Sequence, residues 1–232
     1  MKASIYSNTH LIGYTDLQVG DESMGCLCGE FNPTSNYFEI VQQKVWQFWA
    51  SDKPNYSRWN ALRFNVQLEN GYFLNPMGGY TIEDMIELTD EPKTIQIAGV
   101  FRHVIDDYFK TQPPLPFVEK PWVVIDINQK IYLEDELQKE IKQKENSIFD
   151  FVFAKHALTG YNCSAVCKTI QSDDVLFSIY CDKNSDADFA LVHLTFSGKK
   201  ESSAKWPATT FFEGFDDFKF SRMYPDKAEW ED

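Results

Sequence analysis

A short proline-rich segment divides this sequence and constrains its fold more than any other feature. Residues 111–121 contain four prolines, namely Pro113, Pro114, Pro116 and Pro121. Proline fixes its own φ angle and removes a backbone donor, so such a segment is extended and stiff. It marks either a connector between domains or a crossing loop. The length of 232 residues suits one large domain or two small ones.

We therefore expect an α+β fold of two small domains, each an antiparallel sheet with one or more packed helices. The N-terminal α+β domain is predicted over residues 1–130, a linker helix over 131–148 and the C-terminal α+β domain over 149–232. Leu133, Leu137 and Ile141 form a single narrow apolar stripe on a segment that is otherwise charged. That pattern is typical of a surface or connecting helix.

Several elements are predicted in the N-terminal half. Asn32 as a cap and Pro33 in the first turn predict a helix that ends near Ala50. Its apolar stripe consists of Tyr37, Val41, Val45 and Phe48. Alternating residues predict a strand over 62–68, followed by a hairpin turn at Asn70-Gly71. A short helix is expected over 82–88 and a further strand around 95–100.

The C-terminal half predicts a compact sheet closed by a helix. Strands are expected near residues 122–127, 164–170, 175–181 and 189–196, and the acidic loop 182–188 joins the last two as an antiparallel pair. Thr210 and Glu213 have the spacing of a capping box. They predict a final helix with an inward stripe of Phe211, Phe215 and Phe218, which ends at Pro225.

The charge of the chain narrows the class of partner. The net charge is −13, both halves are acidic, and neither half has a long run of Lys and Arg. Nucleic-acid binding depends largely on neutralising phosphates, so it is disfavoured, and a basic protein partner is favoured. The N-terminus lacks a continuous apolar region, and no stretch approaches the roughly 18 apolar residues of a membrane span. We expect a cytoplasmic protein that does not bind a membrane.

The cysteines do not predict a metal site. Cys26 and Cys28 are two positions apart, Cys163 and Cys167 four apart, whereas structural zinc sites usually place two residues between paired cysteines. Because Cys26 and Cys28 point to one side of a strand, we expect them to pack in the core as free thiols. The odd number of five cysteines suits a reducing compartment. Neither a metal, nor a cofactor, nor a disulfide is expected.

Histidine provides the one candidate for catalysis. His103 and Asp107 would share a helix face, so His103 with Asp106 or Asp107 could act as the general base of a hydrolase-like enzyme. His193 lies in an apolar strand and faces opposite to Val192 and Leu194, which indicates an exposed or hydrogen-bonded side chain. The sequence contains neither a nucleophile motif nor a phosphate-binding glycine loop, so an enzyme is not the expected class.

The last 27 residues combine aromatic side chains with acids. Residues 206–232 contain seven acids and three bases, a net charge of −4. Aromatic residues provide contact area at low entropic cost, and carboxylates attract a basic partner. Most of these rings could alternatively form a core. The residues predicted to bind a partner are Asp182, Asp186, Asp188, Glu213, Asp216, Asp217, Asp226 and Trp230.

Two stretches resemble known bacterial proteins. Residues 5–14, with Met24-Gly25 and residues 29–34, are similar to the opening of a group of uncharacterised bacterial proteins. Residues 174–177, 190–199 and 206–210 resemble a small domain of similar proteins. Such acidic two-part proteins resemble the immunity proteins that neutralise antibacterial toxins delivered by contact-dependent or type VI secretion systems.

This resemblance implies binding and inhibition of a cognate protein toxin and transfers no catalytic residue. A cytosolic inhibitor would meet a toxin that acts inside the cell, and the negative charge favours a basic toxin such as a nuclease. An adaptor or chaperone for a secreted effector would bind protein as well, without blocking its activity. The sequence leaves inhibitor and adaptor open.

Overall fold

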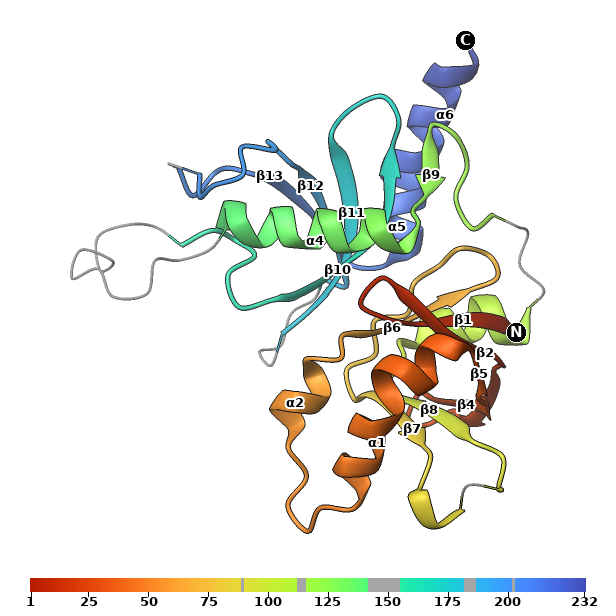
Figure 1. Cartoon of the computed structure of the whole chain (residues 1–232). Helices are drawn as coiled ribbons and strands as arrows, with labels where there is room; N and C mark the ends of the chain where they lie inside the picture. Colours follow the sequence, from red (N-terminus) through yellow and green to blue (C-terminus); the bar gives the residue numbers. More distant parts are fainter. Residues whose placement is uncertain (89, 112–115, 142–154, 182–186, 202) are drawn as a thin grey trace. The chain divides into compact units, whose positions relative to one another are not determined.

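The structure is a computed structural model that describes residues 1–88, 90–111, 116–141, 155–181, 187–201 and 203–232. The chain divides into two compact units, Met1–Leu115 and Pro116–Asp232. The described residues form three antiparallel sheets with accompanying helices, so the fold is α+β (Figure 1). Within this described part, every helix is too short or too polar to cross a membrane.

The first unit contains two four-stranded sheets. The first has the order β5-β2-β1-β6, with β1 at Lys2–Ser7, β2 at His10–Asp16, β5 at Asn32–Pro33 and β6 at Phe64–Leu68. The second has the order β3-β4-β8-β7, with β3 at Gln18–Asp21, β4 at Cys26–Glu30, β7 at Gly79–Glu83 and β8 at Thr94–Ala98. Alternation along each strand turns one apolar row inward. Fully buried members of these rows are Ile5, Ile12, Val66, Leu27, Ile82 and Ile97.

The first helix begins later than predicted. Asn32 and Pro33 pair with Tyr14 and Gly13 as the edge strand β5, where a proline without a backbone N–H is tolerated. The helical segment follows as the π-helix η1 at Tyr37–Val41 and α1 at Gln42–Trp49, with its C-cap at Ala50 as predicted. Three members of the expected stripe, Tyr37, Val41 and Val45, are fully buried.

The predicted turn after β6 is confirmed, whereas the predicted helix over 82–88 is largely wrong. Gly71 has a φ of 94°, and the N–H of Leu68 donates to the carbonyl of Tyr72 at 2.8 Å. Ile82 belongs to β7, and only the 3₁₀ turn η2 at Ile86–Leu88 is helical. Pairing of Ile82 with Ile95 in β8 buries both side chains, which outweighs a short local helix.

Three further helical segments complete the first unit. They are α2 at Tyr56–Asn60, α3 at Arg102–Ile105 and the π-helix η3 at Asp106–Lys110. Asn55 caps α2, since its side-chain oxygen accepts the N–H of Arg58 at 3.0 Å.

The second unit is built on one five-stranded antiparallel sheet. Its order is β13-β12-β11-β10-β9, with β9 at Trp122–Val124, β10 at Asn162–Thr169, β11 at Asp174–Tyr180, β12 at Phe189–His193 and β13 at Ala208–Phe212. Four predicted strands therefore exist with shifted ends, and β11 pairs with β12 antiparallel as expected. Val175–Ile179 are buried at every position, so helices cover both faces of the sheet (Figure 1).

The helix predicted as a linker over 131–148 is instead a core element. It is α4 at Ile127–Ile141, and Asp126 caps it by accepting the N–H of Gln129 at 2.8 Å. Leu133 and Leu137 are buried where α4 packs against β10. The buried carboxylate of Glu140 accepts the N–H of Thr195 at 2.9 Å and that of Phe196 at 2.7 Å. One of the charges that indicated a solvated face therefore binds backbone groups, whereas Asp135 and Lys139 are exposed. Residues 142–148 lie outside the described residues.

The final helix also differs from the prediction. Thr210 lies in β13, paired with Leu191 of β12, and the exposed Phe211 does not join the inward stripe. Helix α5 begins at Phe215 after Gly214 and continues as the π-helix η4 at Lys219–Met223 and α6 at Tyr224–Glu231. Pro225 occupies the first turn of α6, where its missing N–H costs little, so it does not end the helical segment.

Candidate functional site

The C-terminal helical segment buries one row of side chains against the second unit's sheet. Phe215, Phe218 and Met223 are 3% exposed or less. The ring centroid of Phe215 lies 5.6 Å from that of Phe189, and the ring of Phe218 meets Trp122 edge-on at 4.9 Å. This packing fixes which side of the segment faces solvent.

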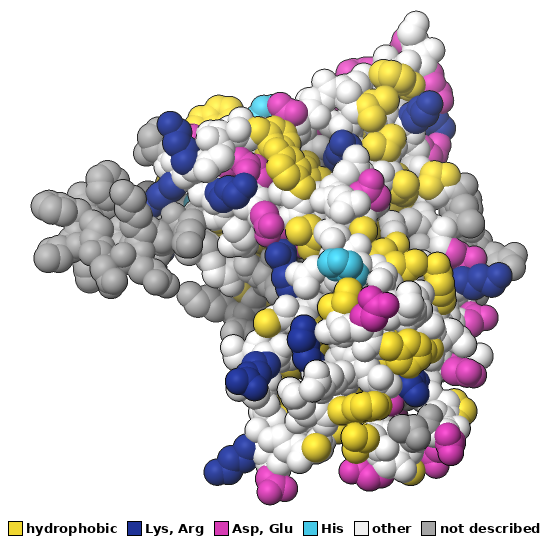
Figure 2. All heavy atoms as spheres, viewed as in Figure 1, with side chains coloured by type: hydrophobic (Ala, Val, Ile, Leu, Met, Phe, Trp, Pro, Cys, Tyr) yellow, Lys and Arg dark blue, Asp and Glu magenta, His cyan; other side chains and the backbone are white. Residues whose placement is uncertain are grey.

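The opposite row combines acids with aromatic rings. Asp216, Phe220 and Tyr224 follow one another at four-residue spacing and share a helix face. Phe220 is 70% exposed, and its ring centroid lies 5.4 Å from that of Tyr224. Together with Glu213 and Asp217, these residues form what we call the acidic–aromatic ridge. Apolar and charged side chains interleave in the upper right of Figure 2, where α6 lies.

The acids of the ridge differ in their surroundings. Asp217 accepts the backbone N–H of Glu213 and the hydroxyl of Ser221, both at 3.2 Å, so it stabilises the start of the helix. Asp216 pairs with Lys219 at 2.5 Å yet keeps a side chain that is 74% exposed. Glu213 makes no ion pair with another described residue. Its charge is therefore the least compensated of the three.

Sequence reasoning did not nominate Phe220 and Tyr224. Their spacing could have predicted that both are exposed, because they lie four residues apart and off the Phe215–Phe218 stripe. A large aromatic ring left in solvent beside acids is the feature that marks this surface.

Asp226 is not part of the exposed surface, contrary to the prediction. Its side chain is 15% exposed, accepts the indole N–H of Trp122 at 2.9 Å and pairs with Arg222 at 3.0 Å. Arg222 also contacts Asp174 at 3.2 Å, and Asp174 contacts His193 Nδ1 at 2.7 Å. This polar cluster fastens the C-terminal helices to β9, β11 and β12. Its members lie up to 104 residues apart, so no local pattern could have indicated it.

The ring of His193 is oriented by a neighbouring carboxylate, as the ring of a general base would be. Its side chain is 43% exposed and hydrogen-bonded to Asp174, which confirms the predicted exposed or hydrogen-bonded orientation. A carboxylate beside an imidazole can orient a general base. Here that carboxylate is shared with Arg222, and the ring centroid of His193 lies 6.1 Å from that of Trp206. The arrangement suits a structural histidine.

The other predicted binding residues divide into three cases. Asp188 is half-buried, and loss of hydration raises the pKa of its carboxyl above the ordinary value. Its backbone bridges two strands, because its N–H donates to Phe212 and its carbonyl accepts from Ile179. Its carboxylate is therefore only partly accessible to a partner. Trp230 is 45% exposed on α6. Asp182 and Asp186 lie outside the described residues.

Asp106, one of the two carboxylates predicted to assist His103, has other partners. Asp106 pairs with Lys110 at 2.7 Å and Arg102 at 3.0 Å. Hydrogen bonds from these two cations hold the pKa of Asp106 below its usual range. The ring of His103 stacks on Phe101 with centroids 5.8 Å apart. Asp106 is thus committed to an ion-pair network rather than to orienting a base.

The cysteines differ in burial from the prediction. In β4 the fully buried residue is Leu27, so strand alternation turns Cys26 and Cys28 outward, and Cys28 is exposed. In β10, burial raises the pKa of the Cys163 thiol to about 12 and that of Cys167 well above its ordinary value. Among the described residues, no three His, Cys, Asp or Glu side chains cluster closely enough to hold a metal ion.

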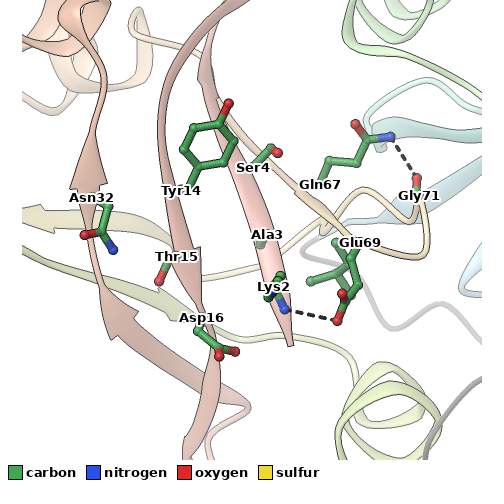
Figure 3. A pocket seen from close by; sticks show the side chains of 11 residues that line it. Lys2, Ala3, Ser4, Tyr14, Thr15, Asp16, Asn32, Gln67, Glu69 and Gly71 are labelled. Carbon is green, nitrogen blue, oxygen red and sulfur yellow. Dashed lines mark hydrogen bonds between the residues drawn. The ribbon is translucent and has the colours of Figure 1, made fainter.

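A shallow hollow of about 640 Å³ lies over the first sheet. Figure 3 shows its lining side chains, which come from β1, β2, β5, β6 and the turn after β6. Two of its acids already have partners, since Glu69 accepts the backbone N–H of Lys2 at 3.2 Å and Asp16 binds the N-terminal ammonium at 2.8 Å. The hollow is an open face of the sheet.

Comparison of the chain with protein-family models, with curated proteins and with solved structures finds no match.

Proposed function

We propose that this protein is an immunity-type inhibitor that binds a basic protein toxin, nuclease-like and active in the cytosol, through the acidic–aromatic ridge. The observation that carries the proposal is the exposed ring pair of Phe220 and Tyr224 on a helical segment whose start carries the exposed acids Glu213 and Asp216. Large exposed rings rimmed by charge are typical of protein-binding surfaces. The net charge of −13 would add long-range attraction for a basic partner.

The proposed roles of the ridge residues follow from their surroundings. Glu213 and Asp216 would accelerate association, because exposed charges steer the encounter of two proteins. Phe220 and Tyr224 would prolong the complex, because buried aromatic anchors mainly slow dissociation. Asp217 would act indirectly, by holding the start of α5 in place.

The proposal includes a two-domain organisation. The two compact units would fold separately, and the second would carry the main interface with the toxin. The predicted boundaries at residues 130 and 149 are replaced in this proposal by a single boundary near Pro116, since α4 belongs to the second unit's core.

The test uses the protein encoded by the gene next to this one as the candidate toxin. Growth rescue on co-expression and binding kinetics at several salt concentrations would be measured for the wild type and two variants. Glu213→Lys should slow association by about threefold or more and reduce its salt dependence. Phe220→Ala should raise the dissociation rate by roughly tenfold. Glu229→Lys changes the charge equally on another face of the same helical segment and serves as the control.

The outcomes separate the candidate functions. Binding and protection that survive both ridge substitutions would place the interface elsewhere. Binding without inhibition would indicate an adaptor or chaperone. Hydrolytic activity that His103→Ala abolishes would establish the enzyme alternative with Asp106 or Asp107.

A further inference from the structure

The first unit contains a local region whose charge is opposite to that of the whole chain. Residues 40–68 include Lys44, Lys53, Arg58 and Arg63 but only one acid, Asp52, so this stretch carries +3. Because the chain as a whole carries −13, the remaining residues carry −16. Figure 2 shows Lys and Arg side chains at the lower left, where α2 lies in Figure 1.

A groove of about 450 Å³ opens between α1 and α2 within this region. Lys44, Gln47, Phe48 and Ser51 line one wall, and Asn55, Arg58, Trp59, Ala61 and Leu62 line the other. The lining thus contains two cations and no acid. Neither Lys44 nor Arg58 forms an ion pair with a described residue, and both are exposed.

The groove has a rigid aromatic floor. The rings of Phe48 and Trp59 lie 4.4 Å apart. The indole N–H of Trp59 donates to the carbonyl of Tyr80 at 3.0 Å, and that of Trp49 donates to Ile82 at 2.9 Å. Both acceptors belong to β7, the edge strand of its sheet, so the two indoles fasten α1 and α2 to that edge. A pre-organised site loses little entropy when a ligand binds.

We propose that this groove binds an acidic protein segment that carries one aromatic or large aliphatic side chain. Carboxylates of the segment would pair with Lys44 and Arg58, and its apolar side chain would rest on Phe48 and Trp59. The lining residues Lys44 and Ser51 lie seven residues apart along α1 and the turn that follows it, roughly 10 Å, which matches about three residues of an extended segment. This inference does not depend on the ridge.

A nucleic acid fits the groove less well than an acidic protein segment. Appreciable affinity for nucleic acid requires the neutralisation of several phosphates, and the groove supplies two cations. The −16 carried by the remaining residues would also repel a long polyanion more strongly than a short acidic segment.

The test measures fluorescence anisotropy of the full chain with a labelled pentapeptide, Glu-Glu-Trp-Glu-Glu. A peptide with glycine in place of tryptophan, a peptide with lysine in place of glutamate and a single-stranded oligonucleotide are compared with it. The double variant Lys44→Glu/Arg58→Glu should bind the acidic peptide at least about tenfold more weakly. Lys53→Glu, in the same basic stretch but outside the groove lining, should change affinity less than about twofold and is the matched control.

Both substituted side chains are exposed, so the double variant should keep the wild-type circular dichroism spectrum and unfolding midpoint. Four results would overturn the proposal: no binding of the acidic peptide to the wild type, an equal loss in Lys53→Glu, tighter binding of the oligonucleotide than of the peptide, or concentration-dependent self-association that the double variant abolishes. The last would make a second copy of this chain the occupant.

Discussion

The acidic–aromatic ridge of the second unit and the groove of the first expose aromatic side chains in opposite electrostatic surroundings. Glu213 and Asp216 accompany Phe220 on the ridge, whereas Lys44 and Arg58 border the groove. The net charge of −13 has the same sign as the ridge and the opposite sign to the groove, so it does not indicate that the groove is basic. Net charge therefore predicts the long-range field of a protein, but a binding surface is defined by which charges lie around its apolar residues.

The two units that carry these surfaces also differ in how each holds one acidic anchor. In the first unit, Asp84 is 3% exposed and accepts the hydroxyl of Tyr37 at 2.7 Å and the amide of Gln42 at 3.0 Å. Lys93 lies 3.4 Å from the other carboxylate oxygen of Asp84. In the second unit, Asp226 accepts the indole N–H of Trp122 and pairs with Arg222, with its side chain 15% exposed. The first anchor is deeply buried and the second is partly hydrated, so their removal should have unequal costs.

The largest effect is expected from Asp84→Ala. The substitution leaves the Tyr37 hydroxyl and the Gln42 amide without their acceptor and the Lys93 ammonium without its counter-ion, which should lower the free energy of unfolding by about 3 kcal/mol. Asp84→Asn keeps an acceptor and should cost less. Hydrogen exchange in urea, read on β1 and β11 amides, would measure each unit separately.

The same measurement tests the proposed domain organisation. If the units fold separately, Asp84→Ala should reduce protection in the first unit, Met1–Leu115, and leave the second unchanged. Equal loss of protection in both units would mean that the chain unfolds as one domain.

A smaller effect is expected from Asp226→Ala. It removes the acceptor of the Trp122 indole and one ion pair of Arg222, and should cost about 1.5 kcal/mol in the second unit. Glu229→Ala, an exposed change on the same helix, should stay within about 0.5 kcal/mol. A cost for Asp226→Ala equal to that of Asp84→Ala would contradict the contrast between a buried and a hydrated anchor.

The smallest effect is expected from Asp188→Asn. Loss of hydration raises the pKa of Asp188, so the folded state disfavours its charged form at neutral pH and this cost disappears as the pH falls through the folded pKa. The variant should therefore be slightly more stable than the wild type at pH 7, by less than about 0.5 kcal/mol once solvent screening is allowed for. Urea unfolding at pH 7 and at pH 3.5 should show the difference shrinking toward zero at the lower pH.

A loss of stability in Asp188→Asn, instead of the expected gain, would assign Asp188 the behaviour of Asp106. Asp106 in the first unit has a pKa lowered by Lys110 and Arg102, so its contribution to stability is present above its unfolded pKa and is lost as the pH falls. An Asp188→Asn variant that loses stability at pH 7 would mean that the Asp188 carboxylate is stabilised by a partner, as Asp106 is.

Local sequence patterns predicted the elements whose side chains follow a single period. Tyr37, Val41 and Val45 are buried as their spacing indicates, and the Asn70-Gly71 turn forms because glycine accepts a positive φ. The same patterns misplaced Thr210, which satisfies a capping-box spacing yet pairs with β12. A local signal for a helix start cannot report that a strand edge lies beside it.

The candidate surfaces were predictable to a lesser degree. Glu213 and Asp216 are exposed as expected, but Asp226 is occupied by Trp122, which lies 104 residues away in the chain. The charged residues of α4 indicated a solvated face, although Glu140 in fact binds backbone N–H groups of a distant loop. Charge in a sequence indicates a preference for polar surroundings, and both water and a folded backbone satisfy that preference.

The sequence by itself determined the α+β character, four of the five strands of the second unit's sheet and the acidic, aromatic composition of the C-terminal segment, because each follows from short-range periodicity or from counting. Only the tertiary structure decided which acids remain exposed and which aromatic rings are left in solvent. It also brought Lys44 and Arg58 to the two walls of one groove, by fastening Trp49 and Trp59 to the edge of β7. These outcomes depend on contacts between residues distant in the chain, and no local pattern encodes them.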